Sequence, residues 1–129
     1  MLQLAVEYID LMYEIADQLP KREEFNLGSQ TRRAATSVAL KIAEGSTGQS
    51  DPEQSRFLGC ALRSLMETVA CQHLIKRREY EINPEDLVEV YRKSETLSRK
   101  LQAMKRAITP RGNHFREDEP TYTVKQGKQ

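Results

Sequence analysis

The sequence predicts an all-α fold, an antiparallel up-down four-helix bundle followed by a C-terminal tail. Apolar residues recur at steps of three and four in four separate stretches, which is the period of helices with one buried face. The composition is 30% charged and 6% aromatic, with no Trp, and this mixture suits amphipathic helices better than a sandwich or barrel. Proline and glycine separate the stretches, and short connections favour antiparallel neighbours. We therefore expect one bundle domain over residues 1–109 and a flexible tail over residues 110–129.

The first helix is predicted from Leu2 to Leu19, where Pro20 ends it. Its core side should be a narrow seam of residues at alternating steps of three and four: Leu2, Ala5, Ile9, Met12, Ala16 and Leu19. The next four residues, Lys21–Glu24, are predicted to form a polar connection.

The second helix is predicted from Leu27 to Glu44, with Asn26 as N-cap and Gly45 as the C-terminal stop. Its core side is unusually rich in small residues, which lets neighbouring backbones approach closely. These core residues are Leu27, Thr31, Ala34, Ala35, Val38 and Ile42.

Two proline-based signals start the remaining helices. Asp51 is the predicted N-cap of the third helix with Pro52 at its first position, and the basic residues 76–78 end it. Its predicted core stripe is Leu58, Leu62, Leu65 and Val69. Asn83 and Pro84 repeat the start signal for the fourth helix, which we expect to run to about Ile108.

Composition limits the cellular setting and the class of partner. The formal net charge is +1, which excludes a uniformly basic nucleic-acid binder but permits segregated charge. No apolar run approaches the roughly 20 residues of a membrane span, and no signal peptide opens the chain. Cys60 and Cys71 lie about 16 Å apart along one predicted helix, too far to form a disulfide. We therefore expect a protein of the reducing cytoplasm.

The sequence gives little support to an enzyme. Its two histidines, His73 and His114, stand at no metal-ligand spacing with cysteine or carboxylate. No phosphate-binding glycine loop follows a predicted strand. We therefore expect no catalytic residue, no metal and no cofactor.

The charges form two ridges. An acidic ridge follows one side of the first helix: Glu7, Asp10, Glu14 and Asp17. A basic ridge lies opposite the apolar seam of the fourth helix: Arg92, Lys93, Arg99, Lys100 and Arg106. Such ridges are often plain solvated faces. The alternatives are that the basic ridge binds nucleic-acid phosphates, or that acidic and basic ridges of neighbouring subunits meet head to tail in a closed ring.

The outward faces of the second and third helices point to assembly. Helical geometry directs Arg33 and Ser37 away from the core on the second helix. On the third helix the outward set is Arg56, Cys60, Arg63, Glu67 and Cys71. Because solvated faces rarely carry two cysteines, we expect an intersubunit contact here; the alternative is a plain solvated face.

Two motifs in the second helix and one stretch of the third carry a family resemblance. Residues 25–38 contain Phe-Asn-Leu and then Gln-Thr-Arg-Arg-Ala-Ala-Thr-Ser-Val, and residues 42–45 read Ile-Ala-Glu-Gly. These motifs, together with Phe57, Leu58, Ala61, Ser64 and Glu67, resemble the four-helix-bundle proteins encoded in intervening sequences of bacterial 23S ribosomal RNA genes. The same motifs are similar to the accessory variability determinant (Avd) proteins of diversity-generating retroelements. Lys41 and Arg63 depart from the family pattern, which has Asn and Gly at these positions.

The resemblance covers about residues 1–108 and implies a homopentameric ring. For the Avd branch it implies binding to a reverse transcriptase and to RNA. For the other branch, the alternative is a scaffold that acts through protein contacts alone. Residue by residue, we expect contacts to an RNA or DNA backbone from Arg92, Lys93, Arg99, Lys100, Arg106, Arg32, Arg33 and Lys41. We expect subunit contacts from Glu7, Asp10, Glu14, Asp17, Ser37, Arg63 and Glu67.

Overall fold

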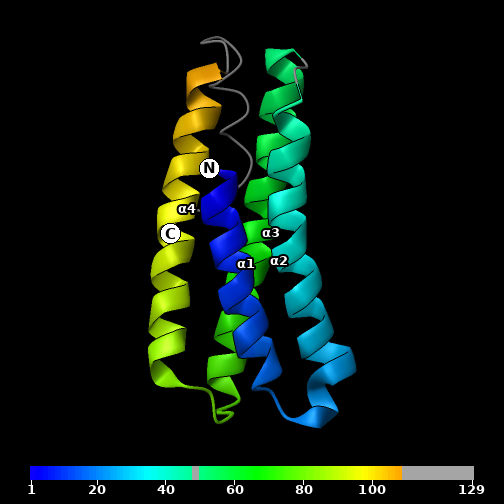
Figure 1. Cartoon of the computed structure of the whole chain (residues 1–129), viewed down its shortest axis with the longest axis vertical. Coiled ribbons are helices and arrows are strands. Elements are labelled where there is room, and N and C mark those ends of the chain that lie inside the picture. Colours follow the sequence, from blue (N-terminus) through cyan, green and yellow to red (C-terminus); the bar gives the residue numbers. More distant parts are fainter. Residues whose placement is uncertain (48–49, 109–129) are drawn as a thin grey trace.

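The computed structural model describes residues 1–47 and 50–108 of the chain. Within these residues the chain forms four α-helices: α1 (Leu2–Asp17), α2 (Ser29–Gly45), α3 (Asp51–Arg77) and α4 (Pro84–Ile108). Successive helices run in opposite directions, and each packs against two neighbours in the cyclic order α1, α2, α3, α4 (Figure 1). The predicted all-α up-down bundle is therefore confirmed. The predicted tail, residues 110–129, lies outside the described residues.

The connection between α1 and α2 is more helical than the sequence predicts. A 3₁₀ turn over Lys21–Glu23 leads directly into a π turn over Glu24–Gly28, and α2 continues from there. Before this connection, α1 ends at Asp17 and not at the predicted Leu19. The reason is steric, because the residue before a proline is pushed out of the helical conformation.

Glu23 caps this connection, and the prediction that Asn26 caps α2 is wrong. The Glu23 carboxylate accepts hydrogen bonds from the Leu27 N–H at 3.3 Å and from the Asn26 side chain at 3.0 Å. It also accepts a hydrogen bond from the Tyr80 hydroxyl, and this bond holds the pKa of the Glu23 carboxyl below its ordinary value. One side chain thus joins the α1–α2 connection to the α3–α4 connection.

The starts of α3 and α4 follow the predicted chemistry with one shift. Ser50, not Asp51, is the N-cap of α3, since its hydroxyl accepts a hydrogen bond from the Glu53 N–H at 3.4 Å. Asp51 falls in the first turn, where its negative charge suits the helix dipole. Asn83 acts as predicted, because its side-chain oxygen accepts from the Glu85 N–H at 2.9 Å.

The core lies along the bundle axis and differs from the predicted seams on two helices. On α1 the prediction misses Tyr8, which is fully buried, whereas Leu2, predicted as core, is exposed. On α3 the buried side is rotated away from the predicted stripe. It comprises Ser55, Leu58, Ala61, Leu65, Thr68, Cys71, Gln72 and Ile75. Leu62 and Val69, predicted as core, are only half-buried.

A polar cluster crosses the centre of this core from α1 to α3. Thr68 donates its only hydroxyl proton to the Leu65 carbonyl at 2.5 Å, so Tyr8 must donate to Thr68 across their 2.7 Å contact. The amide of Gln72 then donates to the Tyr8 oxygen at 2.7 Å. Burial raises the pKa of Tyr8 to about 12. The buried Tyr8 oxygen is therefore paired on both sides.

Cys71 belongs to the core, so its predicted place on an outward face is wrong. Its side chain is buried and belongs to the hydrophobic cluster, and burial raises the pKa of its thiol. Helical geometry places Cys71 at the edge of the core that faces α2, close to Thr31. Cys60, three turns earlier, is half-buried at the α2 side of α3.

Gly45 gives a physical reason for the Ile-Ala-Glu-Gly motif at the end of α2. A Cβ at this position would lie 3.1 Å from the Cβ of Phe57 on α3. Because a Cβ moves only with its backbone, a larger residue at position 45 would push the two helices apart. The glycine therefore permits the close packing of α2 on α3.

Candidate nucleic-acid interface

The three arginines of the basic ridge of α4 point to solvent, as their spacing predicts. Arg92, Arg99 and Arg106 are exposed and lie opposite the buried Val90 and Leu97. The burial of Val90 and Leu97 anchors the helix and fixes the direction of the arginines. At about 1.5 Å per residue, the three arginines span about 21 Å along the axis.

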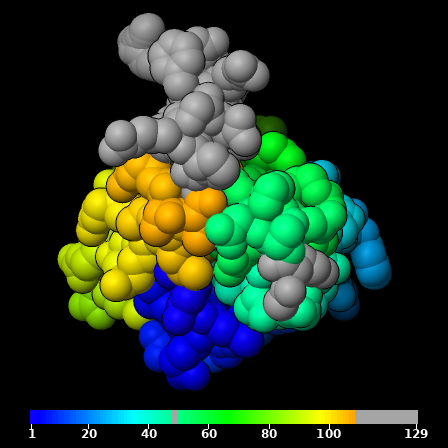
Figure 2. Space-filling model, turned by 90° about the horizontal axis from the view of Figure 1, so that it is seen from above, coloured from blue at the N-terminus to red at the C-terminus, as the bar shows by residue number. Residues whose placement is uncertain are grey.

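Charge is segregated along α4. The first half carries Glu85, Asp86, Glu89 and Glu95, whereas no acidic residue occurs between Glu95 and the end of the helix at Ile108. The second half carries four basic residues: Arg99, Lys100, Lys105 and Arg106. We call these four residues the cationic end of α4. It lies beside the start of α3 when the bundle is seen from above (Figure 2).

The two halves differ in how their basic groups are paired. Arg92 forms an ion pair with Glu89 at 3.2 Å. Lys93 lies 3.7 Å from Glu7 of α1 and 3.9 Å from Glu89, and its side chain is only 26% exposed. In contrast, Arg99, Lys100 and Arg106 are exposed, and none has an ion-pair partner among residues 1–47 and 50–108. Within α4, an anion would therefore meet the fewest competing carboxylates at the cationic end.

Contacts between α3 and α4 fix their register and place Arg63 beside the cationic end. His73 packs edge-on against Tyr91, and a Cβ on Gly59 would lie 3.4 Å from the Cε of Lys105. Arg63, one turn after Gly59, therefore lies at the level of the cationic end. It is exposed, and it donates to the Cys60 sulfur at 3.4 Å.

The basic residues predicted on α2 lie apart from α4, on the opposite side of the bundle. Arg32 pairs with Asp17 of α1 at 2.8 Å, and Lys41 pairs with Glu44 at 3.2 Å. Arg33 is exposed and donates to the Gln30 side chain at 3.3 Å. The fold therefore does not bring the two predicted groups of phosphate contacts together in one copy.

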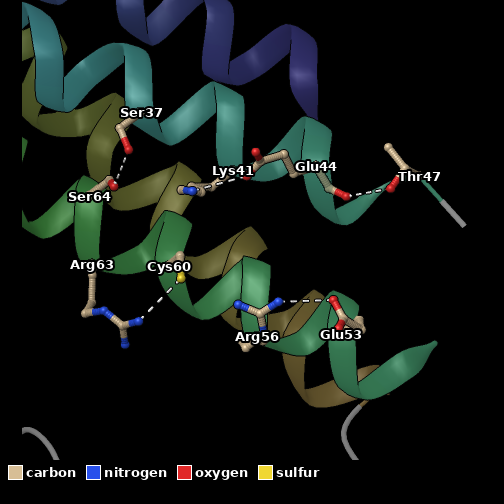
Figure 3. Close-up of polar contacts among 9 residues, drawn as sticks. All are labelled: Ser37, Lys41, Glu44, Thr47, Glu53, Arg56, Cys60, Arg63 and Ser64. Carbon is tan, nitrogen blue, oxygen red and sulfur yellow. Dashed lines mark hydrogen bonds and ion pairs between the residues drawn. The ribbon is translucent and has the colours of Figure 1, made fainter. Parts of the chain in front are cut away.

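The outward surface of α2 and α3, predicted as a subunit contact, carries short-range polar pairs (Figure 3). Ser37 and Ser64 share a hydrogen bond of 2.8 Å between the two helices. Arg56 pairs with Glu53 at 3.1 Å, one helical turn away. Glu67 is exposed on the same helix. Ser37 is thus engaged within the chain, whereas Glu67 and Arg63 reach solvent.

The acidic ridge of α1 is partly neutralised within the chain. Glu7 is the partner of Lys93, and Asp17 is the partner of Arg32. Asp10 and Glu14 are exposed, and neither forms an ion pair within the part of the chain that the structure describes. Half of the ridge is therefore engaged by neighbouring helices of the same copy.

An exposed apolar groove between α1 and α2 was not predicted. Phe25 is 92% exposed, Leu40 58% and Tyr13 38%, and they line a groove of about 550 Å³ together with Arg32 and Arg33. The Phe-Asn-Leu motif placed an aromatic residue, Phe25, before α2. The direction of its side chain depends on the π turn, which the periodicity of apolar residues does not reveal.

Two absences in the described part of the chain concern the membrane and metals. None of the described helices is long and apolar enough to cross a membrane. Within residues 1–47 and 50–108, no three His, Cys, Asp or Glu side chains gather as a metal site would require.

Comparison with known proteins identifies the family. No curated protein matches the chain. The sequence pattern of one family, described as 23S rRNA-intervening sequence protein, matches residues 1–103, which include the helices α1, α2 and α3 and most of α4. The chain therefore belongs to the 23S rRNA-intervening sequence protein family.

Proposed function

We propose that this protein is a non-enzymatic, oligomeric accessory protein that binds RNA through the cationic end of α4. The observation that carries the proposal is the unpaired state of Arg99, Lys100 and Arg106 within the described chain. Guanidinium and ammonium groups without carboxylate partners bind phosphates with little competition from the protein itself. Such contacts position a nucleic-acid backbone without reading its sequence.

Self-association is the second part of the proposal, and exposed apolar side chains support it. Contiguous apolar surface on a small protein commonly marks an interaction site. The ring that we propose is a pentamer, as the family resemblance described above implies. Because Glu7 and Asp17 already pair within one copy, apolar contacts are better placed to hold such a ring than the acidic ridge alone.

A reverse transcriptase is the protein partner that the Avd branch implies, and we propose it for this chain. The alternative branch is a scaffold that acts only through protein contacts. One observation separates them without purification. A neighbouring reverse-transcriptase gene would favour the accessory role, whereas a location inside a 23S ribosomal RNA gene would favour the other branch.

The direct test is RNA binding by the purified protein across a salt series, with the particle mass measured by light scattering in the same buffers. The variant replaces Arg99, Lys100 and Arg106 by Gln. If each residue neutralises one phosphate, the slope of log K against log salt should fall by about 2 for single-stranded RNA. The circular dichroism spectrum of the variant should remain that of a helical protein, because all three side chains are exposed.

A matched control replaces Lys76, Arg77 and Arg78 by Gln at the opposite end of the bundle. These residues are also exposed and basic, so the change in net charge is identical. The control should keep the wild-type salt slope. Equal losses in both variants would show that RNA responds only to net charge, and the assignment to α4 would be wrong.

A further inference from the structure

The apolar groove between α1 and α2 takes no part in the phosphate contacts proposed for α4. Phe25 and Leu40 expose 92% and 58% of their surface there. Tyr13 forms the α1 side, and its hydroxyl is hydrogen-bonded to Thr36 of α2 at 3.2 Å. This hydrogen bond and the packing of α1 on α2 shape the groove before any ligand arrives. The groove therefore offers a preformed apolar surface for an incoming side chain.

Two arginines give the groove a chemical preference. Arg33 has no carboxylate partner in the described part of the chain and contacts only the Gln30 amide oxygen, at 3.3 Å. Arg32 lies over the Tyr13 ring, 5.9 Å from its centroid, and pairs with Asp17. Glu24 is the acidic residue in the lining. A ligand with an aromatic ring followed by carboxylates would cover the apolar surface and pair with Arg33.

The chain itself contains a segment of this chemistry. Residues 115–119 read Phe-Arg-Glu-Asp-Glu, which places an aromatic ring next to three acids and one basic residue. We propose that this segment of one copy docks in the α1–α2 groove of a second copy. Phe115 would cover Leu40 and Tyr13, and the acids would pair with Arg33.

The reach of the chain favours a second copy over the same copy. Arg32 pairs with Asp17, and the adjacent Gln18 donates to Asp86 of α4 at 2.9 Å, so these residues lie at one level of the bundle. From Asp86 to Ile108 the helix rises about 33 Å.

The segment after Ile108 would have to be fully extended to return over that distance. Glu117 is nine residues beyond Ile108 and reaches at most about 31 Å when fully extended. It would also have to cross the width of α1, about 10 Å. Arg33 of the same copy could therefore be met only by a fully extended segment, with the two side chains closing the last few ångströms, which costs the most conformational entropy. The Arg33 of a neighbouring copy is not constrained in this way.

The test uses a photo-crosslinking amino acid, p-benzoylphenylalanine, in the full chain. It replaces Leu40 in the groove, and in the control it replaces Val88 on α4, since the two side chains are 58% and 57% exposed. Unlabelled and ¹⁵N-labelled copies are mixed, irradiated and digested, and the crosslinked peptides are identified by mass spectrometry. Crosslinks from position 40 to residues 113–119 in mixed-isotope pairs are expected, with none from position 88.

Three results would overturn the proposal: no crosslink to this segment, crosslinks only within one isotope, or equal crosslinking from position 88. A charge exchange adds a second readout. Arg33→Glu should lower the mixed-isotope crosslink by about fivefold, the upper range for one exposed ion pair. Adding Glu117→Arg to that variant should restore it, and failure to restore would remove the charge argument.

The inference rests on the self-association in the proposed function, but the two can fail separately. Light scattering of the same samples gives the particle mass. A ring-sized particle without the crosslink would overturn the segment contact and leave the proposed assembly intact. A monomer at the same concentration would overturn both.

Discussion

Two buried hydroxyl groups in the core should respond in opposite directions to the same chemical change. Tyr8 and Thr31 are both fully buried. The Tyr8 oxygen is hydrogen-bonded to Thr68 and Gln72, each at 2.7 Å. The Thr31 oxygen has no partner at hydrogen-bond geometry among residues 1–47 and 50–108, and the polar group beside it is the Cys71 thiol, a weak donor. Deleting each hydroxyl in turn therefore measures how a paired and an unpaired buried hydroxyl each change the free energy of unfolding.

Tyr8→Phe should destabilise the bundle by about 2 kcal/mol. Thr68 keeps its bond to the Leu65 carbonyl at 2.5 Å, but the Gln72 amide keeps only the Met12 sulfur at 3.9 Å. A buried donor left unsatisfied costs about 1 to 3 kcal/mol. For a domain of this size the midpoint of thermal unfolding should fall by roughly 8 °C.

Thr31→Val should stabilise the bundle by about 1 kcal/mol. The substitution conserves volume and removes a hydroxyl that is buried without a hydrogen bond, and this burial is itself unfavourable. Thermal and urea unfolding of both variants, followed by circular dichroism at 222 nm, measure the two changes. A loss of stability in Thr31→Val as large as in Tyr8→Phe would refute this account of the core.

A double-mutant cycle checks the cause of the Tyr8 effect. Replacing Gln72 by Leu in the Tyr8→Phe background removes the unsatisfied donor. The double variant should therefore lose less stability than the sum of the losses of the two single variants. A coupling energy of about 1 kcal/mol or more is expected for groups in direct contact. Strict additivity would mean that Tyr8→Phe acts through packing and not through the Gln72 hydrogen bond.

Two further predictions concern titration and thiol reactivity. Because the pKa of Tyr8 is raised to about 12 in the folded state from an ordinary value near 10, its hydroxyl contributes stability that is complete below pH 10 and is lost as the pH rises toward 12. The free-energy difference between wild type and Tyr8→Phe should therefore shrink by about 1 kcal/mol between pH 10 and pH 11, because half of the unfolded-state tyrosine is already ionised at pH 10; a pH-independent difference would contradict this. With a disulfide reagent such as DTNB, the half-buried Cys60 should react in the folded protein, whereas Cys71, whose thiol pKa is raised by burial, should react only on unfolding. Two equally fast thiols, or no change in the fast phase of a Cys60→Ser variant, would contradict the burial of Cys71.

The four helices could be predicted because local signals agree with one another. Periodic apolar residues, the prolines near the starts of α3 and α4, and Gly45 all mark the same boundaries to within a few residues. The outward direction of Arg92, Arg99 and Arg106 follows from the same period, since it depends on one helix alone. These features need no knowledge of how the helices pack.

The remaining features depend on contacts between elements, which periodicity does not contain. The buried side of α3 is rotated because Thr68 and Gln72, polar residues, find partners on α1. The connection before α2 is helical because Glu23 caps it from outside the predicted helix. The pairing of Lys93 with Glu7 requires the register of α1 against α4. None of these relations can be read from one segment of the sequence.

The segregation of charge along α4 explains how a chain with a net charge of +1 could bind RNA. In each copy Glu89, in the first half of α4, pairs with Arg92 and Lys93, whereas the cationic end has no carboxylate of its own helix to neutralise it. Under cyclic symmetry, equivalent points lie on one circle about the axis. The proposed ring would therefore carry all its cationic ends on a single circle, and one RNA strand could contact several copies at once. Weak contacts from a few residues per copy would then add as linked binding sites, so assembly and RNA affinity should be lost together when the ring dissociates.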